Sequence, residues 1–198
     1  MSKKLDFYPI CLIGPAGAGK TWLLTKNKDE HFAFDKNVIQ STIGHETTQL
    51  QINLDGLDVT LKVFDTSGQN ALAALIPMIS RDCYCAIICF DPEEEDCLQK
   101  VQEFKEIYLD QNNSYKKIFY VATKNDLWKD KPLPYNIQDF INDPENDVII
   151  TSVINNTNFR VPFEKAAAFC AELPFPTIEE EQELVVDDKK TPKKSCCS

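Results

Sequence analysis

The chain has 198 residues, a length that fits one domain, and apolar residues make up 43% of it, enough for a buried core. The 31 acidic residues outnumber the 21 basic ones and give a net charge of −10, which argues against a general nucleic-acid binder because attraction to phosphate needs a positive surface. No apolar run is long enough for a transmembrane helix, and no apolar segment follows the first residues as it does in a signal peptide, so we expect a cytosolic chain with reduced thiols.

The first part of the chain alternates between strand and helix patterns. Tyr8 to Ile13 is a short apolar run that glycines end, which predicts a buried strand, and we expect a helix to begin near Lys20. Residues 50–54 and 57–63 each alternate between apolar and polar side chains, and Asp55-Gly56 between them is the strongest short signal for a hairpin. An antiparallel hairpin is therefore expected after the first helix.

The second part of the chain repeats strand and helix without a hairpin. Residues 84–90 and 118–122 are apolar without alternation, as in parallel strands that helices cover on both faces. Residues 101–108 carry a helical apolar stripe, residues 148–150 form a last strand, and a final helix runs from Val161 to Leu173. The expected fold is a three-layer α/β/α domain around a mostly parallel sheet of about six strands, one of them an antiparallel hairpin strand.

The composition changes after Leu173. We expect the folded domain at residues 5–173 and a disordered tail at residues 174–198, because the Pro, Glu, Asp and Lys residues of the tail bury too little apolar surface to offset the entropy of ordering.

Three cysteines, Cys83, Cys85 and Cys89, are expected on one face of a strand. A metal site is one interpretation of this spacing, but no histidine lies near these cysteines in the sequence. We therefore favour buried thiols that pack as small apolar side chains.

Residues 14–21 match the P-loop pattern G-x-x-x-x-G-K-[ST] and read Gly14-Pro15-Ala16-Gly17-Ala18-Gly19-Lys20-Thr21. The spacing lets successive backbone N–H groups curl around a β-phosphate, while the helix that begins here directs its positive end at the anion. We expect Lys20 to reach the β- and γ-phosphate oxygens and the Thr21 hydroxyl to bind Mg²⁺. A P-loop alone does not distinguish a GTPase from an ATPase or a nucleotide kinase.

Further motifs follow the P-loop in a characteristic order. Asp65-Thr66-Ser67-Gly68-Gln69 and Thr123-Lys124-Asn125-Asp126 each end a strand, where an open α/β sheet binds its ligand. Together with the P-loop and Thr42-Ile43-Gly44, these segments resemble a small GTPase of the Ras superfamily, with its P-loop NTPase fold. Within that superfamily the chain is most similar to the Rab branch, through Thr42-Ile43-Gly44, residues 75–82 and Cys196-Cys197.

The resemblance implies a set of residues around the phosphates and the metal ion. Thr42 would bind Mg²⁺ and touch the γ-phosphate, and Asp65 would hold Mg²⁺ through a water molecule. The Gly68 N–H would contact the γ-phosphate, and Gln69 would orient the attacking water. The implied metal-binding residues are Thr21, Thr42 and Asp65, and the implied catalytic residues are Gln69, Lys20 and Thr42.

The resemblance also implies a guanine pocket. Asp126 would accept hydrogen bonds from the guanine N1–H and exocyclic amine, a pattern that adenine lacks. Lys124 would lie along the base plane, Phe32 would pack on the other face, and the backbone of Ser152 and Val153 would contact the guanine oxygen. The implied residues for binding GTP or GDP are Gly14, Ala16, Gly17, Ala18, Gly19, Lys20, Thr21, Phe32, Thr42, Gly68, Thr123, Lys124, Asp126, Ser152 and Val153.

By this resemblance the chain is a Rab-type switch that hydrolyses GTP to GDP slowly and regulates vesicle trafficking. Neither of its arginines, Arg81 and Arg160, lies in or next to the P-loop or Gln69, so an activating protein is expected to supply the missing charge. Two alternatives stay open. Ala16 and Asn70 depart from the family pattern and suggest a non-hydrolysing GTP-binding scaffold, whereas a P-loop nucleoside kinase needs an arginine-bearing lid that two arginines do not supply.

The end of the tail predicts lipid attachment. Ser195 stands where a C-a-a-X box needs cysteine, so the adjacent Cys196 and Cys197 instead resemble the Rab pattern, which implies a geranylgeranyl group on each. Two lipids give stable anchoring, whereas one gives only marginal binding. We therefore expect the protein on the cytoplasmic face of an endomembrane, with a cytosolic pool. The implied partners are an exchange factor, a GTPase-activating protein, effectors, a prenylation escort and a carrier that withdraws the lipids.

Overall fold

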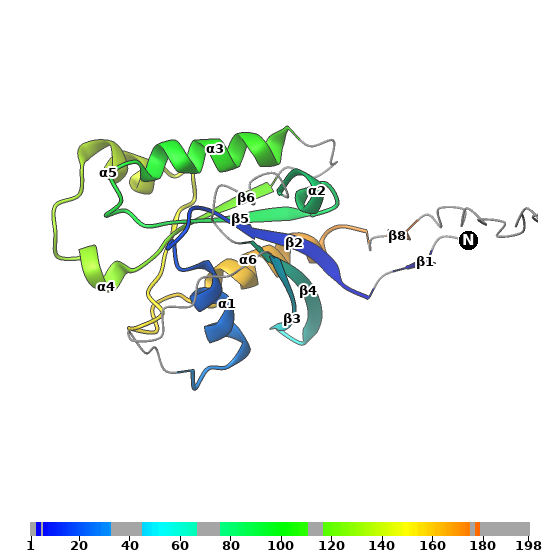
Figure 1. The fold of residues 1–198 in the computed structure, drawn as a ribbon. Coiled ribbons are helices and arrows are strands. Elements are labelled where there is room, and N and C mark those ends of the chain that lie inside the picture. Colours follow the sequence, from blue (N-terminus) through cyan, green and yellow to red (C-terminus); the bar gives the residue numbers. More distant parts are fainter. Residues whose placement is uncertain are drawn as a thin grey trace, which may run out of the picture.

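A six-stranded sheet between two layers of helices forms the centre of the computed structural model (Figure 1), which describes residues 3–4, 6–32, 45–66, 76–110, 117–174 and 177–178. The strands of this sheet are β2 (Tyr8–Ile13), β3 (His45–Leu54), β4 (Leu57–Thr66), β5 (Cys85–Phe90), β6 (Lys117–Ala122) and β7 (Ile149–Ile150). They lie in the order β3-β4-β2-β5-β6-β7, and only the β3–β4 pair is antiparallel. The expected mostly parallel sheet with one antiparallel hairpin strand is confirmed. A separate two-stranded sheet pairs β1 (Lys3–Lys4) with β8 (Thr177–Ile178).

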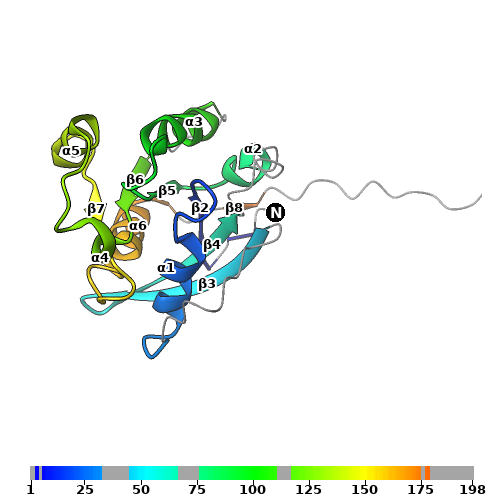
Figure 2. The same cartoon turned by 60° about the vertical axis from the view of Figure 1, so that its left-hand side comes forward.

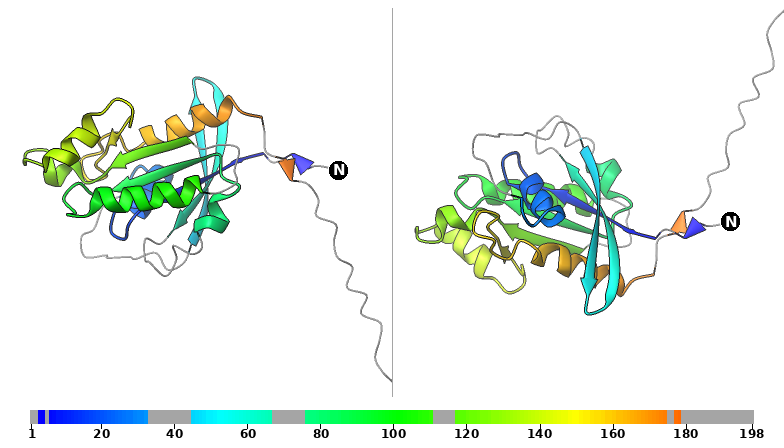
Figure 3. Two further views of the ribbon diagram at one scale, coloured as in Figure 1. Left: turned by 90° about the horizontal axis from the view of Figure 1, so that it is seen from above. Right: turned by 90° about the horizontal axis from the view of Figure 1, so that it is seen from below.

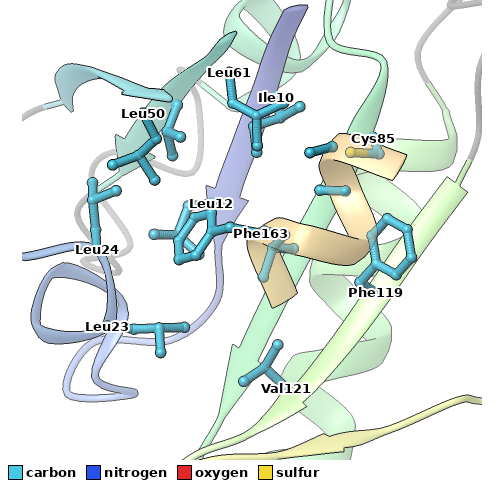
Figure 4. Close-up of a cluster of buried hydrophobic side chains, with 14 of the residues drawn as sticks. Ile10, Leu12, Leu23, Leu24, Leu50, Leu61, Cys85, Phe119, Val121 and Phe163 are labelled. Atoms are coloured by element: carbon cyan, nitrogen blue, oxygen red, sulfur yellow. The ribbon is translucent and has the colours of Figure 1, made fainter. Parts of the chain in front are cut away.

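Helices cover both faces of the sheet, as Figures 2 and 3 show from other directions. The helices are α1 (Lys20–Lys28), α2 (Ile76–Ser80), α3 (Cys97–Leu109), α4 (Asn125–Trp128), α5 (Tyr135–Asn142) and α6 (Val161–Ala171). On one face, Leu23 of α1 and Phe163 of α6 pack in a core cluster (Figure 4), whereas α2, α3 and α5 pack in a second cluster on the other face. In the described part of the chain, no helix has the length and apolar character needed to cross a bilayer.

The central strand β2 shows why its sequence is apolar without alternation. Ile10 and Leu12 point into the core cluster of α1 and α6, whereas Cys11 and Ile13 point into the cluster of α3. All six residues of the strand are buried. Since helices cover both faces, neither set of alternate residues meets water.

The β3–β4 hairpin turns at Asp55-Gly56, as predicted. Leu54 pairs with Leu57 across the turn, and the two turn residues have φ angles of 49° and 95°. Positive φ at both central positions matches the twist of the flanking strands. On the inner face of β4, Leu61 and Val63 are fully buried.

The six cysteines of the described residues are free and buried, and they lie on both faces of the sheet. Cys85 and Cys89 pack on the α6 side, but Cys83 packs with Cys11 on the α3 side. The prediction that Cys83 shares a face with the other two is therefore wrong. The reason is that β5 begins only at Cys85, so the alternation of the strand does not extend back to Cys83.

Two tyrosine side chains hydrogen-bond the segment that follows α6. The Tyr8 hydroxyl donates to the carbonyl oxygen of Leu173 at 3.2 Å, and the Tyr84 hydroxyl donates to that of Pro174 at 3.1 Å. Their rings meet edge to face, with centroids 5.3 Å apart. Further along the chain, β8 pairs with β1. The residues of β8 lie in the range 174–198, where the composition predicts a tail.

Candidate functional site

The loop between β2 and α1 carries the P-loop residues at the carboxyl end of β2 (Figure 1). Gly14 has a φ of 137°, and a Cβ atom there would lie 2.2 Å from the carbonyl oxygen of Cys89 in β5. Gly19 has a φ of 79° and immediately precedes α1. Only glycine therefore fits at Gly14. The loop leads directly into the N-terminus of α1, which is the arrangement that a phosphate cradle requires.

Lys20, the first residue of α1, is buried inside this loop. Its ammonium group donates hydrogen bonds to the carbonyl oxygens of Gly14 and Pro15, both at 2.8 Å. Burial lowers the pKa of Lys20, and Cys89 and Asp65 oppose this shift. A buried cation whose hydrogen bonds go to neutral carbonyl oxygens is a favourable partner for a phosphate anion.

Thr21 and Asp65 form an oxygen-rich corner beside the loop. The Thr21 hydroxyl donates to Oδ2 of Asp65 at 2.6 Å, and Asp65, near the end of β4, is fully buried. Hydroxyl and carboxylate oxygens are the hard ligands that Mg²⁺ prefers. The two residues thus fit the predicted metal site, whose third predicted ligand, Thr42, lies outside the described residues.

The segment after β6 connects the P-loop with the rest of the site. The Thr123 hydroxyl shares its hydrogen bond between the carbonyl oxygens of Ala18 and Phe90, both at 3.0 Å. Lys124 has a φ of 58°, and its ammonium group forms a 2.7 Å ion pair with the buried carboxylate of Asp91. Both predicted residues are thereby fixed relative to the P-loop and to the end of β5.

Asp126 of α4 and Ser152 after β7 meet at the other end of the site. The Ser152 hydroxyl donates to Oδ1 of Asp126 at 2.5 Å and accepts the N–H of Asn155 at 3.1 Å. The backbone of Ser152 exchanges two further hydrogen bonds with Thr157, at 3.0 and 2.8 Å. A closed loop therefore orients the half-buried carboxylate of Asp126.

A cavity of about 360 Å³ is lined by residues of α1, α4 and the loop after β7. The predicted nucleotide-binding residues that line it are Gly19, Thr123, Lys124, Asp126 and Val153. Thr151 and four apolar residues complete the lining, and the apolar ones are Trp22, Leu23, Leu127 and Ile154. Trp22 and Leu127 were not predicted as site residues, although each directly follows a motif, because neither belongs to the motif pattern.

Phe32, which the resemblance assigns to one face of the base, packs against Trp22. The two ring centroids are 5.2 Å apart and the ring planes meet at 41°. Among the described residues that line the cavity, the aromatic one is Trp22. The structure thus brings Phe32 to the site as a neighbour of Trp22 rather than as part of the cavity wall.

Comparison with known sequences shows the family of this chain. A sequence model of the Ras family matches residues 9–172, which include the P-loop, Asp65, Asp126 and Ser152. The chain belongs to the Ras family.

The curated relatives of this Ras-family chain carry Rab-like and Ras-like names, at low identity. Ras-related protein Rab-26 of Rattus norvegicus is 31% identical over 101 residues, which are 49% of this chain and 38% of that protein. Ras-like GTP-binding protein RYL2 of Yarrowia lipolytica is 31% identical over 124 residues, which are 62% of this chain and 57% of that protein. Ras-related protein YPTC6 of Chlamydomonas reinhardtii is 26% identical over 171 residues, or 83% and 78%. The chain therefore spans less than two thirds of the length of the first two.

Several predicted residues of this Ras-family chain lie outside the part that the structure describes, namely Thr42, Gly68, Gln69, Cys196 and Cys197. The described site residues form two groups. One group surrounds the P-loop and the start of α1, and the other surrounds Asp126. The cavity between the two groups extends from Gly19 to Val153.

Proposed function

We propose that this chain is a GTP-binding molecular switch of the Rab type, which hydrolyses GTP to GDP and regulates vesicle trafficking. Membership of the Ras family supports guanine-nucleotide binding and GTPase activity in general. The observation that carries the choice of base is the Asp126 carboxylate, which Ser152 orients at a cavity that Gly19 and Thr123 connect to the P-loop. An acceptor at this position suits the two donors on one edge of guanine, and a site built for such donors rejects a base that lacks them.

The phosphate end of the site supplies binding and charge. The backbone of residues 14–19 receives the phosphates, and Lys20 turns from its two carbonyl partners towards their oxygens. Thr21, Asp65 and Thr42 would hold Mg²⁺, which when bound neutralises charge on the phosphate oxygens.

Hydrolysis depends on a residue of this chain and on a partner. Gln69 orients the attacking water. Of the two arginines, Arg160 pairs with Glu30 and Arg81 lies 3.5 Å from Asp82, and all four side chains are largely exposed. Neither arginine is held at the P-loop, so intrinsic hydrolysis is slow and an activating protein supplies the cation.

The switch and its location follow from the same assignment. Thr42 and Gly68 contact the γ-phosphate, so hydrolysis releases the segments that carry them. Effectors bind the GTP form, and an exchange factor restores it. Geranylgeranyl groups on Cys196 and Cys197 hold the protein on the cytoplasmic face of an endomembrane, and an escort and a lipid-withdrawing carrier maintain its cytosolic pool.

Single-turnover hydrolysis by the full-length protein, loaded with GTP in the presence of Mg²⁺, tests this proposal. We expect GTP to bind on the order of 100-fold or more tighter than ATP and to release phosphate slowly. Equal affinities for GTP and ATP would contradict the choice of base. Tight GTP binding without any phosphate release would contradict the hydrolytic part and favour a GTP-binding scaffold.

A further inference from the structure

Trp22 is a cavity residue to which none of the roles above applies. It is the third residue of α1, directly after Lys20 and Thr21. Its side chain is half-buried and lines the cavity that also contains Thr123 and Asp126. Trp22 therefore forms part of the wall between the P-loop and the residue that selects the base.

Hydrogen bonds that involve the backbone of the neighbouring Phe32 fix the position of this residue. The buried Lys26 donates to the carbonyl oxygen of Phe32 at 3.0 Å and to that of Glu30 at 2.6 Å. The N–H of Phe32 donates to the carbonyl oxygen of Asp29 at 3.0 Å. With its ring centroid 5.2 Å from that of Trp22, Phe32 is placed to brace the indole.

Two more large apolar side chains border the same cavity. Leu127 and Ile154 line it, and each is 43% exposed. Exposed apolar surface around a cavity gains free energy when a ligand covers it. A flat heteroaromatic ring suits these walls, because its faces are apolar while its polar edge can reach Asp126.

We propose that Trp22 makes the aromatic contact with the nucleoside of the bound nucleotide, and that Phe32 is a positioning residue that braces Trp22. This inference rests on the proposed guanine-nucleotide binding and names the side chain that stacks on the nucleoside. It differs from the family resemblance, which gives the aromatic contact to Phe32. The difference follows from the residues that line the cavity, which include Trp22 and do not include Phe32.

The aromatic contact with the nucleoside is made either by Trp22, as proposed, or by Phe32, as the family resemblance implies. Measuring how much the nucleoside contributes to binding in variants of each residue distinguishes the two. For each variant, the dissociation constants of GDP and of inorganic pyrophosphate are measured, and their ratio reports the contacts that the nucleoside makes. Trp22→Ala should reduce this ratio on the order of tenfold or more, because a base–aromatic stacking contact is lost. Trp22→Phe should restore most of the ratio, and Phe32→Ala should reduce it less than Trp22→Ala does.

Three results overturn the inference or the function beneath it. An unchanged ratio in Trp22→Ala, or a larger loss in Phe32→Ala, would overturn the role of Trp22. A parallel loss of GDP and pyrophosphate affinity in Trp22→Ala would also overturn it, since the damage would then lie in the P-loop. If the unmutated protein binds no guanine nucleotide, the proposed function itself fails, and this result precedes any variant.

Tryptophan fluorescence provides a readout that does not need the alanine variant to fold. The chain has two tryptophans, and the buried Trp128 donates its indole N–H to the carbonyl oxygen of Thr123 at 2.7 Å. Trp128→Phe leaves Trp22 as the single reporter, and Trp22→Phe leaves Trp128. GDP should change the Trp22 emission more than the Trp128 emission, and pyrophosphate should not reproduce the Trp22 change. Equal responses of Trp22 to GDP and pyrophosphate would overturn the direct contact.

Discussion

The hydroxyl of Ser152 donates a 2.5 Å hydrogen bond to a carboxylate oxygen of Asp126, 26 positions earlier in the chain. Ser152 is fully buried, and its oxygen also accepts the N–H of Asn155, so the hydroxyl has a fixed direction. The orientation of the carboxylate in α4 is therefore set by the loop after β7. We therefore expect the proposed base selectivity at Asp126 to depend on Ser152, whose hydroxyl holds this carboxylate.

Ser152→Ala removes this restraint and leaves the Asn155 N–H without its acceptor. We expect the affinity for GTP to fall about tenfold, corresponding to ~1–2 kcal/mol for the lost hydrogen bonds. The dissociation rate of a fluorescent guanine nucleotide measures the effect. Ser80→Ala, which removes a buried hydroxyl that donates to the Ile76 carbonyl in α2, is the matched control. Equal dissociation rates in both variants would argue against a role of Ser152 in the site.

Asp126→Asn tests the choice of base directly. The amide presents a donor where the carboxylate has an acceptor, so preference should shift from GTP to xanthosine triphosphate, whose exocyclic group is an oxygen. Loss of an acceptor for a buried donor costs ~1–3 kcal/mol per bond, so the affinity for GTP should fall at least about tenfold. Competition between the two nucleotides measures the shift. Asp130→Asn changes a carboxylate whose side chain is 87% exposed and should leave the preference for GTP intact.

Gln69→Leu separates binding from hydrolysis. The variant should bind GTP as the unmutated protein does and hydrolyse it more slowly, because the attacking water loses its orienting partner. Phosphate release from a preloaded GTP complex measures this step without interference from nucleotide exchange. A rate equal to that of the unmutated protein would remove Gln69 from the catalytic residues.

Buried thiols predict a loss of stability at alkaline pH. Burial raises the pKa of Cys89 to about 12 and that of Cys97 to about 11, from an ordinary value of 9.0. Between pH 9 and 12 the native state keeps the Cys89 proton that the unfolded state loses, so the free energy of unfolding falls by up to ~1.4 kcal/mol per pH unit for this thiol. The lowered pKa of Lys20 has the opposite effect on the free energy of unfolding. Just below about pH 10.5 the unfolded chain binds a proton that the native state lacks, so this group makes the free energy of unfolding rise with pH.

Cys89→Ala isolates the thiol in this pH range. The variant should lose stability at neutral pH by creating a cavity, yet its free energy of unfolding should decline less steeply above pH 9. Urea unfolding at a series of pH values, at one saturating nucleotide concentration, gives both slopes. Identical slopes for the variant and the unmutated protein would refute the contribution of Cys89.

The parts of the fold that sequence reasoning predicted well are those with local signals. The strand Tyr8–Ile13 was predicted with both of its ends, because an apolar run stops at Gly14, where a side chain would collide with β5. The hairpin was predicted from Asp55-Gly56, whose positive φ angles few other residue pairs adopt. In both places the residue type itself restricts the backbone.

The features that were missed depend on contacts between distant residues. Trp22 becomes a cavity residue because α1 lies near Asp126 and Ile154, more than 100 positions later in the chain. The pairing of β8 with β1 joins residues 177–178 to residues 3–4, and no pattern in two residues predicts such a partner. Hydrophobic periodicity predicts which face of an element is buried, but it does not name the opposing side chain.

The last prediction concerns attachment of the protein to membranes through its C-terminal residues. Cys196→Ser combined with Cys197→Ser should move the protein from the membrane fraction of a cell to the soluble fraction, because both lipid sites are removed. Each single variant should bind weakly, since one lipid chain gives only marginal, reversible attachment. Lys189, Lys190, Lys193 and Lys194 add attraction to anionic lipids, worth ~1 kcal/mol each near the surface. That attraction alone does not hold a chain whose net charge is −10.

Cys97→Ser is the control for this experiment, because it changes a buried thiol of α3 and leaves both terminal cysteines intact. It should stay in the membrane fraction to the extent that it folds, which guanine-nucleotide binding reports independently. A double variant that stays fully membrane-bound would refute lipid attachment at Cys196 and Cys197. In that case the anchor would have to lie in another part of the chain or in a bound partner. Washing the membranes with high salt would then distinguish electrostatic attachment from a lipid anchor. Salt weakens the attraction between charged surfaces but does not extract a buried lipid chain.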